Sequence, residues 1–379
     1  MTDFFYCKTC LMPSTRPRIR FDADGICNAC NWAKRKQTLD WGKRQTELWN
    51  LCAKYKGNGK EWDIIVPFSG GKDSFYIAHQ MKHTYKMNPL LVYIPPLIPS
   101  KIGRRNVEHF KSLGYSVLEV CPDCQVYIGL CKRGLIDFGM PQWGFEVGLT
   151  TIILRVAIQY QIPFIMYGEE GETEDGGKIG KEDDPKIDLA WAKETYFSGN
   201  DIMQYEKDFG YSPDFWQYWT PPSDEEIGIL NPYITHWSYF HNWDSRVHLA
   251  GAEKLGFKRV EDYNDGAWPW HTSTNYNSLD DPWMRSLTCR FMYLKFGFGR
   301  GTDDVKNEVW HGRMTRENGF VHAWQYDDYD CLEFRHKYLN LFNMTETEFL
   351  DVEDKWANKD ILVRTWKYNP FRYIWTLNR

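Results

Sequence analysis

A short loop in the first third of the chain gathers residue types that bind phosphate. The stretch PFSGGKDSFY, residues 67–76, holds two glycines, a lysine, an aspartate and two serines, and it follows the apolar run DIIV. Glycines let a backbone approach its ligand closely, and a helix that begins after such a loop offers free N–H groups to an anion. The pattern therefore indicates a phosphate site. Its residues are Ser69, Gly70, Gly71, Lys72, Asp73 and Ser74.

Two common phosphate-binding loops do not fit this stretch. A Walker loop needs Gly, four residues, Gly, Lys and then Ser or Thr. Here Val66 occupies the position of the first glycine and Asp73 that of the Ser or Thr. The G-x-G-x-x-G pattern of dinucleotide-binding proteins does not occur at the loop either. The loop is therefore of another kind.

Four of the ten cysteines form a second chemical pattern. Cys7, Cys10, Cys27 and Cys30 give C-x2-C, sixteen residues, and C-x2-C again. This spacing is typical of a four-thiolate zinc site, and four protein ligands make such a site structural rather than catalytic. The intervening DADG favours a hairpin turn between two short strands, as in a zinc ribbon. Disulfides are the alternative, which a reducing compartment disfavours.

The remaining cysteines give weaker signals. Cys121 and Cys124 form a third C-x2-C pair, without a second pair nearby. Redox chemistry or an iron–sulfur ligand is one interpretation, but two cysteines packed at the end of a strand is the favoured one. Cys52, Cys289 and Cys331 are isolated and are expected to be packing residues.

The elements around the loop alternate between strands and helices. Short apolar runs predict buried strands, and they lie at 62–68, 88–96, 115–121 and 162–169. Helical periodicity is found before and between them, at 38–56, 74–87, 103–114 and 147–161. This alternation predicts parallel βαβ units and hence a doubly wound α/β sheet. Ligands bind such sheets at the carboxyl ends of strands, where the loop lies.

The same pattern divides the chain into three predicted parts. Residues 1–36 form the zinc-ribbon segment, and residues 37–170 form the α/β domain that carries the phosphate-type loop. From residue 171 onward the alternation is lost. Residues 171–379 are predicted to be a mostly helical substrate-binding region with long loops, which completes the fold.

Composition limits the class of protein. The chain has 51 acidic and 46 basic residues and a net charge of −5, which argues against a dominant basic face for nucleic acid. No stretch approaches the roughly eighteen apolar residues of a membrane span. The N-terminal MTDFFYCKTC lacks the layout of a signal peptide. A cytoplasmic protein is therefore expected.

The loop resembles that of a known superfamily. SGGKDS is similar to the pyrophosphate loop of the ATP pyrophosphatases, S-G-G-x-D-S, at all five specified positions. The resemblance implies a HUP-like α/β fold that cleaves ATP between the α- and β-phosphates and uses the AMP part to activate a carbonyl oxygen. It implies that Lys72 and Asp73 are catalytic and that Mg²⁺ helps to offset the charge of the departing pyrophosphate.

Over nearly its whole length the chain also resembles the N-acetyl sugar amidotransferases of bacterial surface-polysaccharide synthesis. The stretches that carry this resemblance are CKTCLMPSTRPRIRFDADGICNAC, YGEEGETEDGGK and YLKFGFGRGTDDVKNEVWHGRMTRENG. The family often has Ala at the position of Gly301 and His at that of Asp304. A catalytic role for Asp304 is therefore left open.

The resemblance implies a reaction and its partners. The N-acetyl group of a nucleotide-linked sugar or sugar acid is adenylated on its amide oxygen, and ammonia then displaces AMP to give an acetamidino sugar. The implied cofactors are ATP, Mg²⁺ and a structural Zn²⁺. A separate glutaminase subunit is the implied ammonia source, since no stretch here is typical of a glutaminase. A tRNA thiolase is the alternative, and a non-catalytic zinc-ribbon adaptor is a third possibility that the intact loop disfavours.

The acidic segment offers carboxylates at the end of the fourth predicted strand. Its members are Glu169, Glu170, Glu172 and Glu174. Such groups could hold Mg²⁺ or stabilise the amidinium product, with Glu169 as a catalytic and Glu174 as a substrate-binding residue. A solvated acidic loop is an equal alternative.

The third stretch offers a basic set for an anionic substrate. It consists of Lys295, Arg300, Arg313 and Arg316. Arginine binds carboxylates and diphosphates bidentately, and Arg300 is also predicted to be catalytic. The alternative is pairing with nearby acidic residues.

Overall fold

The computed structural model describes most of the chain. The described residues are 4–58, 61–175, 180, 182–187, 189–190, 197, 199–260, 271–368 and 371–377. Residues 176–178, at the end of the acidic segment, lie outside them. Among the described residues, no helix combines the length and the apolar character that a membrane span requires.

A parallel sheet of five strands organises the chain, and its order is β3-β2-β1-β4-β5. The strands are β1 (Ile64–Pro67), β2 (Pro89–Tyr93), β3 (Ser116–Glu119), β4 (Phe164–Tyr167) and β5 (Tyr233–His236). The first four confirm the predicted strands, and the doubly wound α/β fold class is confirmed with them. β5 adds an edge strand that was not predicted, and it comes from the region that was predicted to be mostly helical.

Both faces of the sheet are covered, which explains why β1 is apolar at successive positions. Ile64 and Val66 pack into a core on one face, while Ile65 between them packs into a core on the other. Parallel strands buried in this way carry near-continuous apolar runs. The covering helices include α2 (Trp41–Tyr55), α3 (Lys72–His83), α4 (Lys101–Ser112) and α6 (Trp143–Tyr160).

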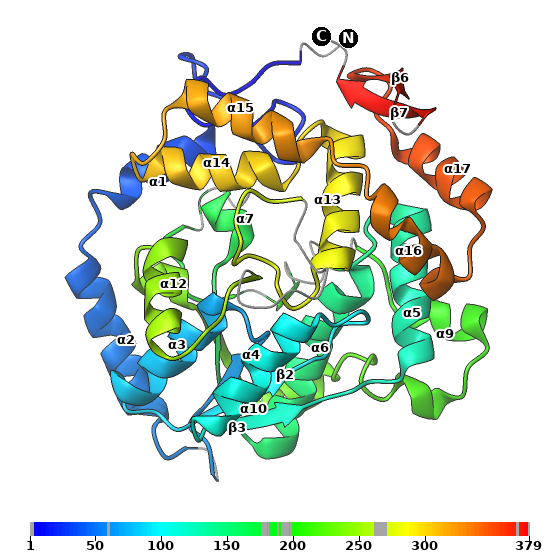
Figure 1. Cartoon of the computed structure of the whole chain (residues 1–379). Coiled ribbons are helices and arrows are strands. Elements are labelled where there is room, and N and C mark those ends of the chain that lie inside the picture. The colour runs from blue at the N-terminus through cyan, green and yellow to red at the C-terminus, as the bar shows by residue number, and fades with distance from the viewer. Residues whose placement is uncertain are drawn as a thin grey trace.

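The remaining described elements are mostly helical. The helices among them include α5 (Cys124–Arg133), a π-helical turn (Gly134–Phe138), α7 (Gly171–Glu174), α9 (Gln204–Phe209), α10 (Asp224–Leu230), α11 (Trp237–Phe240), α12 (Ser245–Lys254), α13 (Pro282–Phe296), α14 (Arg300–Trp310), α15 (Arg316–Asp327), α16 (Arg335–Phe342) and α17 (Glu346–Trp356). Figure 1 shows α14 and α15 side by side above α12 and α3, with the N-terminal segment beside them. An antiparallel hairpin, β6 (Leu362–Tyr368) and β7 (Phe371–Leu377), follows.

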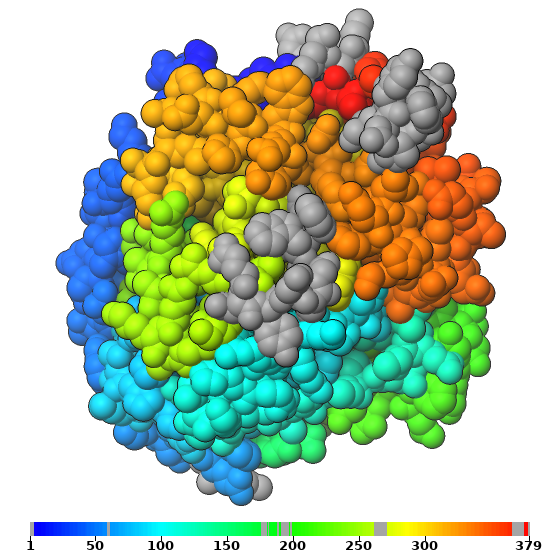
Figure 2. Space-filling model, viewed as in Figure 1, coloured from blue at the N-terminus to red at the C-terminus, as the bar shows by residue number. Residues whose placement is uncertain are grey.

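Segments that are far apart in the sequence lie next to one another on the surface of the molecule. Figure 2 shows α4 in cyan and α12 in yellow-green below the orange C-terminal helices on the same face. The largest aromatic core lies under those C-terminal helices and includes Trp143, Trp219, Phe291 and Tyr338. Many of the chain's aromatic residues are therefore packing residues.

The N-terminal segment differs from the predicted ribbon. The DADG turn is present, with Gly25 at a φ of +76° and its N–H donating to the carbonyl of Asp22 at 3.0 Å. The flanking residues form only single bridges, Tyr6 with Pro13 and Phe21 with Cys27, rather than strands. The helix α1 (Asn28–Lys36) follows the last bridge.

Candidate active site

The loop between β1 and α3 is folded by its own side chains. The Ser69 hydroxyl accepts from the N–H of Gly71 at 3.2 Å, and the Ser74 hydroxyl donates to the carbonyl of Gly71 at 3.0 Å. Gly70 has a φ of +77°, and a Cβ there would come within 2.4 Å of a methyl group of Val107. Only glycine fits this position. The amide groups at the start of α3 therefore stand ready for an anion.

The loop forms one end of a cavity of about 520 Å³ at the carboxyl ends of the strands. Apolar side chains form much of its wall, among them Val66, Val92, Leu149, Ile187 and Ile234. An apolar wall beside a phosphate-type loop suits a ligand with a flat ring at one end and phosphates at the other. We call this space the loop cavity.

A second cavity of about 810 Å³ adjoins the first and is lined mainly by polar and charged side chains. Trp243, Thr274, Asn275, Asp303 and Lys306 are among them. We call it the polar cavity. The residues that line both cavities include Lys72, Asp73, Glu169, Arg285 and Arg300. Charged groups from separate parts of the chain thus converge where the cavities meet.

Lys72 and Asp73 form the centre of this junction. The Lys72 ammonium donates to Asp73 Oδ2 at 2.8 Å and to Asn277 Oδ1 at 2.7 Å. Burial opposes ionisation of the Asp73 carboxyl, but the Lys72 charge and a hydrogen bond from His248 hold its pKa well below the usual range. Asp73 is therefore ionised at neutral pH.

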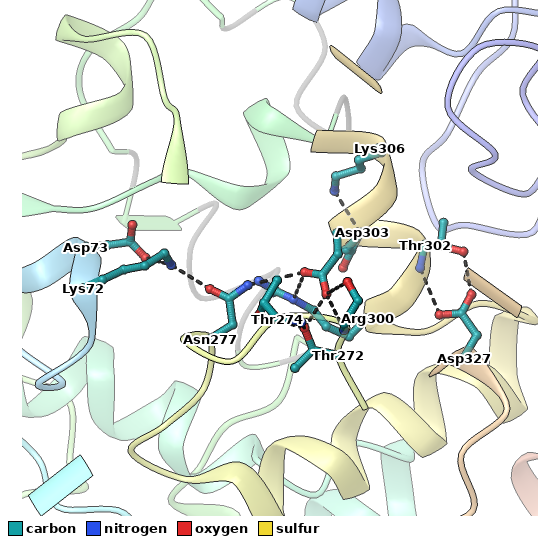
Figure 3. A network of polar contacts seen from close by, with 12 residues as sticks. Lys72, Asp73, Thr272, Thr274, Asn277, Arg300, Thr302, Asp303, Lys306 and Asp327 are labelled. Carbon is teal, nitrogen blue, oxygen red and sulfur yellow. Dashed lines mark hydrogen bonds and ion pairs between the residues drawn. The ribbon is translucent and has the colours of Figure 1, made fainter. Parts of the chain in front are cut away.

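Asn277 connects the loop to a buried carboxylate, and Figure 3 shows its contact with Lys72 of the loop. The Asn277 amide donates to Asp304 Oδ1 at 3.4 Å, and the Arg300 guanidinium donates to the same oxygen at 3.0 Å. The Thr272 hydroxyl donates to the other oxygen. Asp304, only 6% exposed, thus holds Arg300 at the junction. This arrangement favours an anchoring role for Asp304.

Arg285 is a cation at the junction that the sequence did not single out. It comes from α13, lines both cavities, and donates to Gln142 Oε1 at 3.4 Å. Within the part of the chain that the structure describes, no carboxylate lies within ion-pair distance of it. A guanidinium that lines a cavity without an ion-pair partner is available to an anionic ligand. The local sequence of α13 did not indicate that Arg285 would line the cavities.

The acidic segment is divided between the cavities and the N-terminal segment. Glu169 is exposed where the two cavities meet, while desolvation by the surrounding protein and the charge of Asp73 raise the pKa of its carboxyl. Glu174 lines the polar cavity but pairs with Lys36 at 2.5 Å. Glu172 pairs with an arginine of the N-terminal segment, and Glu170 caps α7.

The structure brings Arg300, but not the rest of the predicted basic set, to the cavities. Lys295 donates to the carbonyl of Phe138 at 2.7 Å, and Arg316 donates to that of Cys7 at 3.1 Å. Arg313 is in ion pairs with two carboxylates. None of these three is among the residues that line the loop cavity or the polar cavity.

The four N-terminal cysteines are buried together, with their sulfur atoms all within 4.8 Å of one another. The Sγ of Cys7 lies 3.8 Å from that of Cys30, and the Sγ of Cys10 lies 3.6 Å from that of Cys27. A tetrahedral ion with metal–sulfur bonds of about 2.3 Å requires sulfur separations of about 3.8 Å. The indole N–H of Trp310 donates to one sulfur at 3.2 Å. The group therefore fits one metal ion.

The other cysteines divide into two classes. Cys52, Cys289 and Cys331 are buried, which confirms the prediction of packing residues. Cys121 and Cys124 are both exposed, so the favoured interpretation of a packed pair was wrong. The strand before them, β3, ends at Glu119, and α5 begins at Cys124.

The sheet order and the SGGKDS loop between β1 and α3 give the doubly wound α/β fold that the resemblance of the loop to the ATP pyrophosphatases implies. The family comparison concerns the C-terminal residues of the site. Residues 271–377 match the family model of the "LPS biosynthesis protein WbpG-like, C-terminal domain". This range includes the residues that hold the loop from the C-terminal side, Asn277, Arg300 and Asp304.

Other similarities are weaker. An uncharacterized protein of Methanocaldococcus jannaschii is 30% identical over 89 residues, which are 23% of this chain and 32% of that protein. The chain thus matches about a third of that relative's length. The U34-tRNA thiolase NcsA from Methanococcus maripaludis, solved with its 4Fe–4S cluster, is 14% identical with a TM-score of 0.30, covering 72% of this chain and 79% of that one. The NH3-dependent NAD synthetase from Campylobacter jejuni is 13% identical with a TM-score of 0.26, covering 51% and 92%.

Proposed function

We propose that this protein is an ATP-dependent amidotransferase that converts the N-acetyl group of a nucleotide-linked sugar or sugar acid into an acetamidino group. The observation that carries the proposal is the meeting of the two cavities at Lys72, Asp73 and Arg300. One cavity suits ATP, and the other is polar enough for a carbohydrate. The WbpG-like match over residues 271–377 supports a sugar of bacterial surface polysaccharide as the acceptor.

ATP fits the loop cavity with its base against the apolar wall and its phosphates at the loop. The N–H groups of the loop and the start of α3 bind the β- and γ-phosphates, and Lys72 offsets their charge. Asp73 and Glu169 would hold Mg²⁺ through their carboxylate oxygens, and the ion would offset the negative charge of the phosphates. The α-phosphate then lies at the junction, facing the polar cavity.

The first step activates the amide. The amide oxygen of the acceptor attacks the α-phosphorus, the bond to the bridging oxygen breaks, and pyrophosphate leaves with that oxygen. Lys72 stabilises the charge that develops on the leaving group. Arg300 and Arg285 stand at the junction, where they bind the α-phosphate or an anionic group of the acceptor.

The second step makes the amidine. Ammonia adds to the activated carbon, AMP leaves with the former amide oxygen, and one proton is released. Glu169 accepts this proton, because its raised pKa makes it a better base than an ordinary carboxylate. A separate glutaminase subunit supplies the ammonia in the cytoplasm, where ATP and nucleotide sugars are available.

The four cysteines bind one structural Zn²⁺ in this proposal. A site of four thiolates leaves no open position for a substrate, which suits a structural ion. The ion would hold together a segment that lacks strands of its own. Several side chains of this segment reach the acidic segment, so the ion stabilises one border of the polar cavity.

One observation favours a second candidate. The exposed pair Cys121 and Cys124 offers accessible thiols, as a sulfur-transferring enzyme requires. A PP-loop tRNA thiolase would also adenylate a carbonyl oxygen, and sulfur would then displace AMP. The family match of residues 271–377 favours the sugar reaction.

The purified protein with ATP, Mg²⁺ and ammonium chloride is expected to release AMP and pyrophosphate when the correct N-acetylated nucleotide sugar from a panel is added. The sugar product should lose one oxygen and gain one NH group, which mass spectrometry detects. Glutamine should replace ammonium only when a glutaminase subunit is present. Formation of ADP and phosphate, or turnover with tRNA and a sulfur donor instead, would reject the proposal.

Arg300→Ala is expected to raise the KM for the acceptor sugar by about ten- to hundredfold, the effect of losing one charged hydrogen bond at the junction. Arg313→Ala is the matched control, because Arg313 belongs to the same predicted basic set but lies outside both cavities. Its KM should equal that of the wild type. Equal effects of the two substitutions in steady-state kinetics would show that the junction does not bind the acceptor.

A further inference from the structure

His248 is buried beside the phosphate loop and is held by two aromatic rings. It lies on α12 and is 2% exposed. Its ring stacks on Tyr76 of α3, with centroids 4.7 Å apart and planes inclined by 22°. Trp243 meets the same ring edge-on at 4.5 Å. The orientation of the imidazole is therefore set by packing.

The close approach of the two helices is built into the sequence. A Cβ at Gly251 of α12 would come within 2.4 Å of the Tyr76 ring. Glycine at this position lets α12 lie directly against α3. The contact is about one helical turn after Asp73 on α3. The imidazole is thereby brought to the loop from an element far away in the sequence.

The imidazole Nδ1 lies 2.8 Å from Asp73 Oδ1. The other carboxylate oxygen of Asp73 accepts from Lys72 at 2.8 Å. An ionised carboxylate can only accept hydrogen bonds, so Nδ1 carries the proton in this contact. Both oxygens of Asp73 are thus held by donors, one on each side, and its side chain has a single orientation.

We infer that His248 is a positioning residue, which acts through its Nδ1–H to fix the Asp73 carboxylate in the orientation that binds Mg²⁺–pyrophosphate. The inference rests on the proposed ATP chemistry and adds a residue that lies outside the loop motif and the family-matched region. Without the Nδ1–H, the Asp73 carboxylate keeps only its contact with Lys72 and is free to rotate, so its second oxygen is no longer held in one position.

Two substitutions separate this role from packing. His248→Phe keeps a ring between Tyr76 and Trp243 but removes the donor. His248→Asn loses the ring but places an N–H donor near the former position of Nδ1. We expect the Phe variant to lose about ten- to hundredfold in kcat, as misplaced catalytic groups do, with the KM for ATP changed much less. The Asn variant should recover most of this loss, although it is the less stable of the two.

Mg²⁺–pyrophosphate binding, measured by calorimetry, tests the inference without turnover. The Phe variant should bind this probe about tenfold more weakly than the wild type, whereas the Asn variant should bind it nearly as well. Equal binding by all three proteins, equal loss in both variants, or no binding by the wild type would overturn the inference. If the wild type binds the probe but modifies no acetylated sugar, the proposed substrate fails and the role of His248 is still decided.

Discussion

Lys72→Met is expected to reduce the formation of AMP and pyrophosphate by roughly a thousandfold, the scale of losing one preorganised charge at a developing anion. The Lys72 ammonium is buried at the junction of the two cavities and donates to both Asp73 and Asn277. Methionine has a similar length and no charge, so it leaves the pyrophosphate without its main cationic partner. The measurement is the rate of pyrophosphate release with saturating acceptor and ammonium.

Lys254→Met is the matched control for this substitution. Lys254 is exposed at the end of α12 and does not line either cavity. It should retain the wild-type rate. The thermal midpoint of the Lys72 variant should be compared as well, because a fold that is lost would reduce the rate for another reason. A folded Lys72 variant with near wild-type turnover would contradict the role assigned to the loop.

The sequence was sufficient to predict the part of the fold that local patterns determine. An apolar run, a glycine-rich loop and a periodic helix follow one another without interruption, and β1, the loop and α3 appear where these patterns indicate. The four cysteines also needed no distant information, because each C-x2-C pair forms a local turn. In such cases the covalent spacing of residues already defines their geometry.

Long-range packing explains what the sequence did not reveal. β5 is four residues long and becomes a strand only by pairing with β4. His248 carries no local signal, since its position follows from the contact of α12 with α3. Arg285 and Arg313 are both arginines of C-terminal segments, and only the tertiary structure shows that the first lines the cavities and the second does not.

The ion pairs of the acidic segment also could not be predicted from the sequence. Its carboxylates were predicted to face a ligand or the solvent, with equal weight. In the structure several of them instead meet basic residues that lie about 150 positions away in the sequence, such as Arg18 with Glu172 and Lys36 with Glu174. Charge patterns along a chain do not reveal such partners.

Cys27→Ser is expected to remove the bound zinc, from about one ion per chain to almost none, and to lower the thermal midpoint. A serine oxygen is a poor substitute for a thiolate on this ion. Cys124→Ser is the matched control, since Cys124 is exposed and lies outside the four-cysteine group. Its zinc content and midpoint should not change. Metal analysis and calorimetry measure both quantities.

The loss of zinc should act on acceptor binding more than on ATP binding, because of the ion pairs that leave the N-terminal segment. Lys36 pairs with Glu174 at 2.5 Å, and Arg16 pairs with Asp175 at 3.0 Å. Asp175 also pairs with Lys306, and all three partner residues line the polar cavity but not the loop cavity. Without the ion the segment loosens, buried charges lose their partners, and this wall of the polar cavity shifts.

Cys27→Ser should therefore raise the KM for the acceptor sugar while the affinity for ATP stays near that of the wild type. A parallel loss of both affinities would show that the segment supports the whole fold and not one wall of the site.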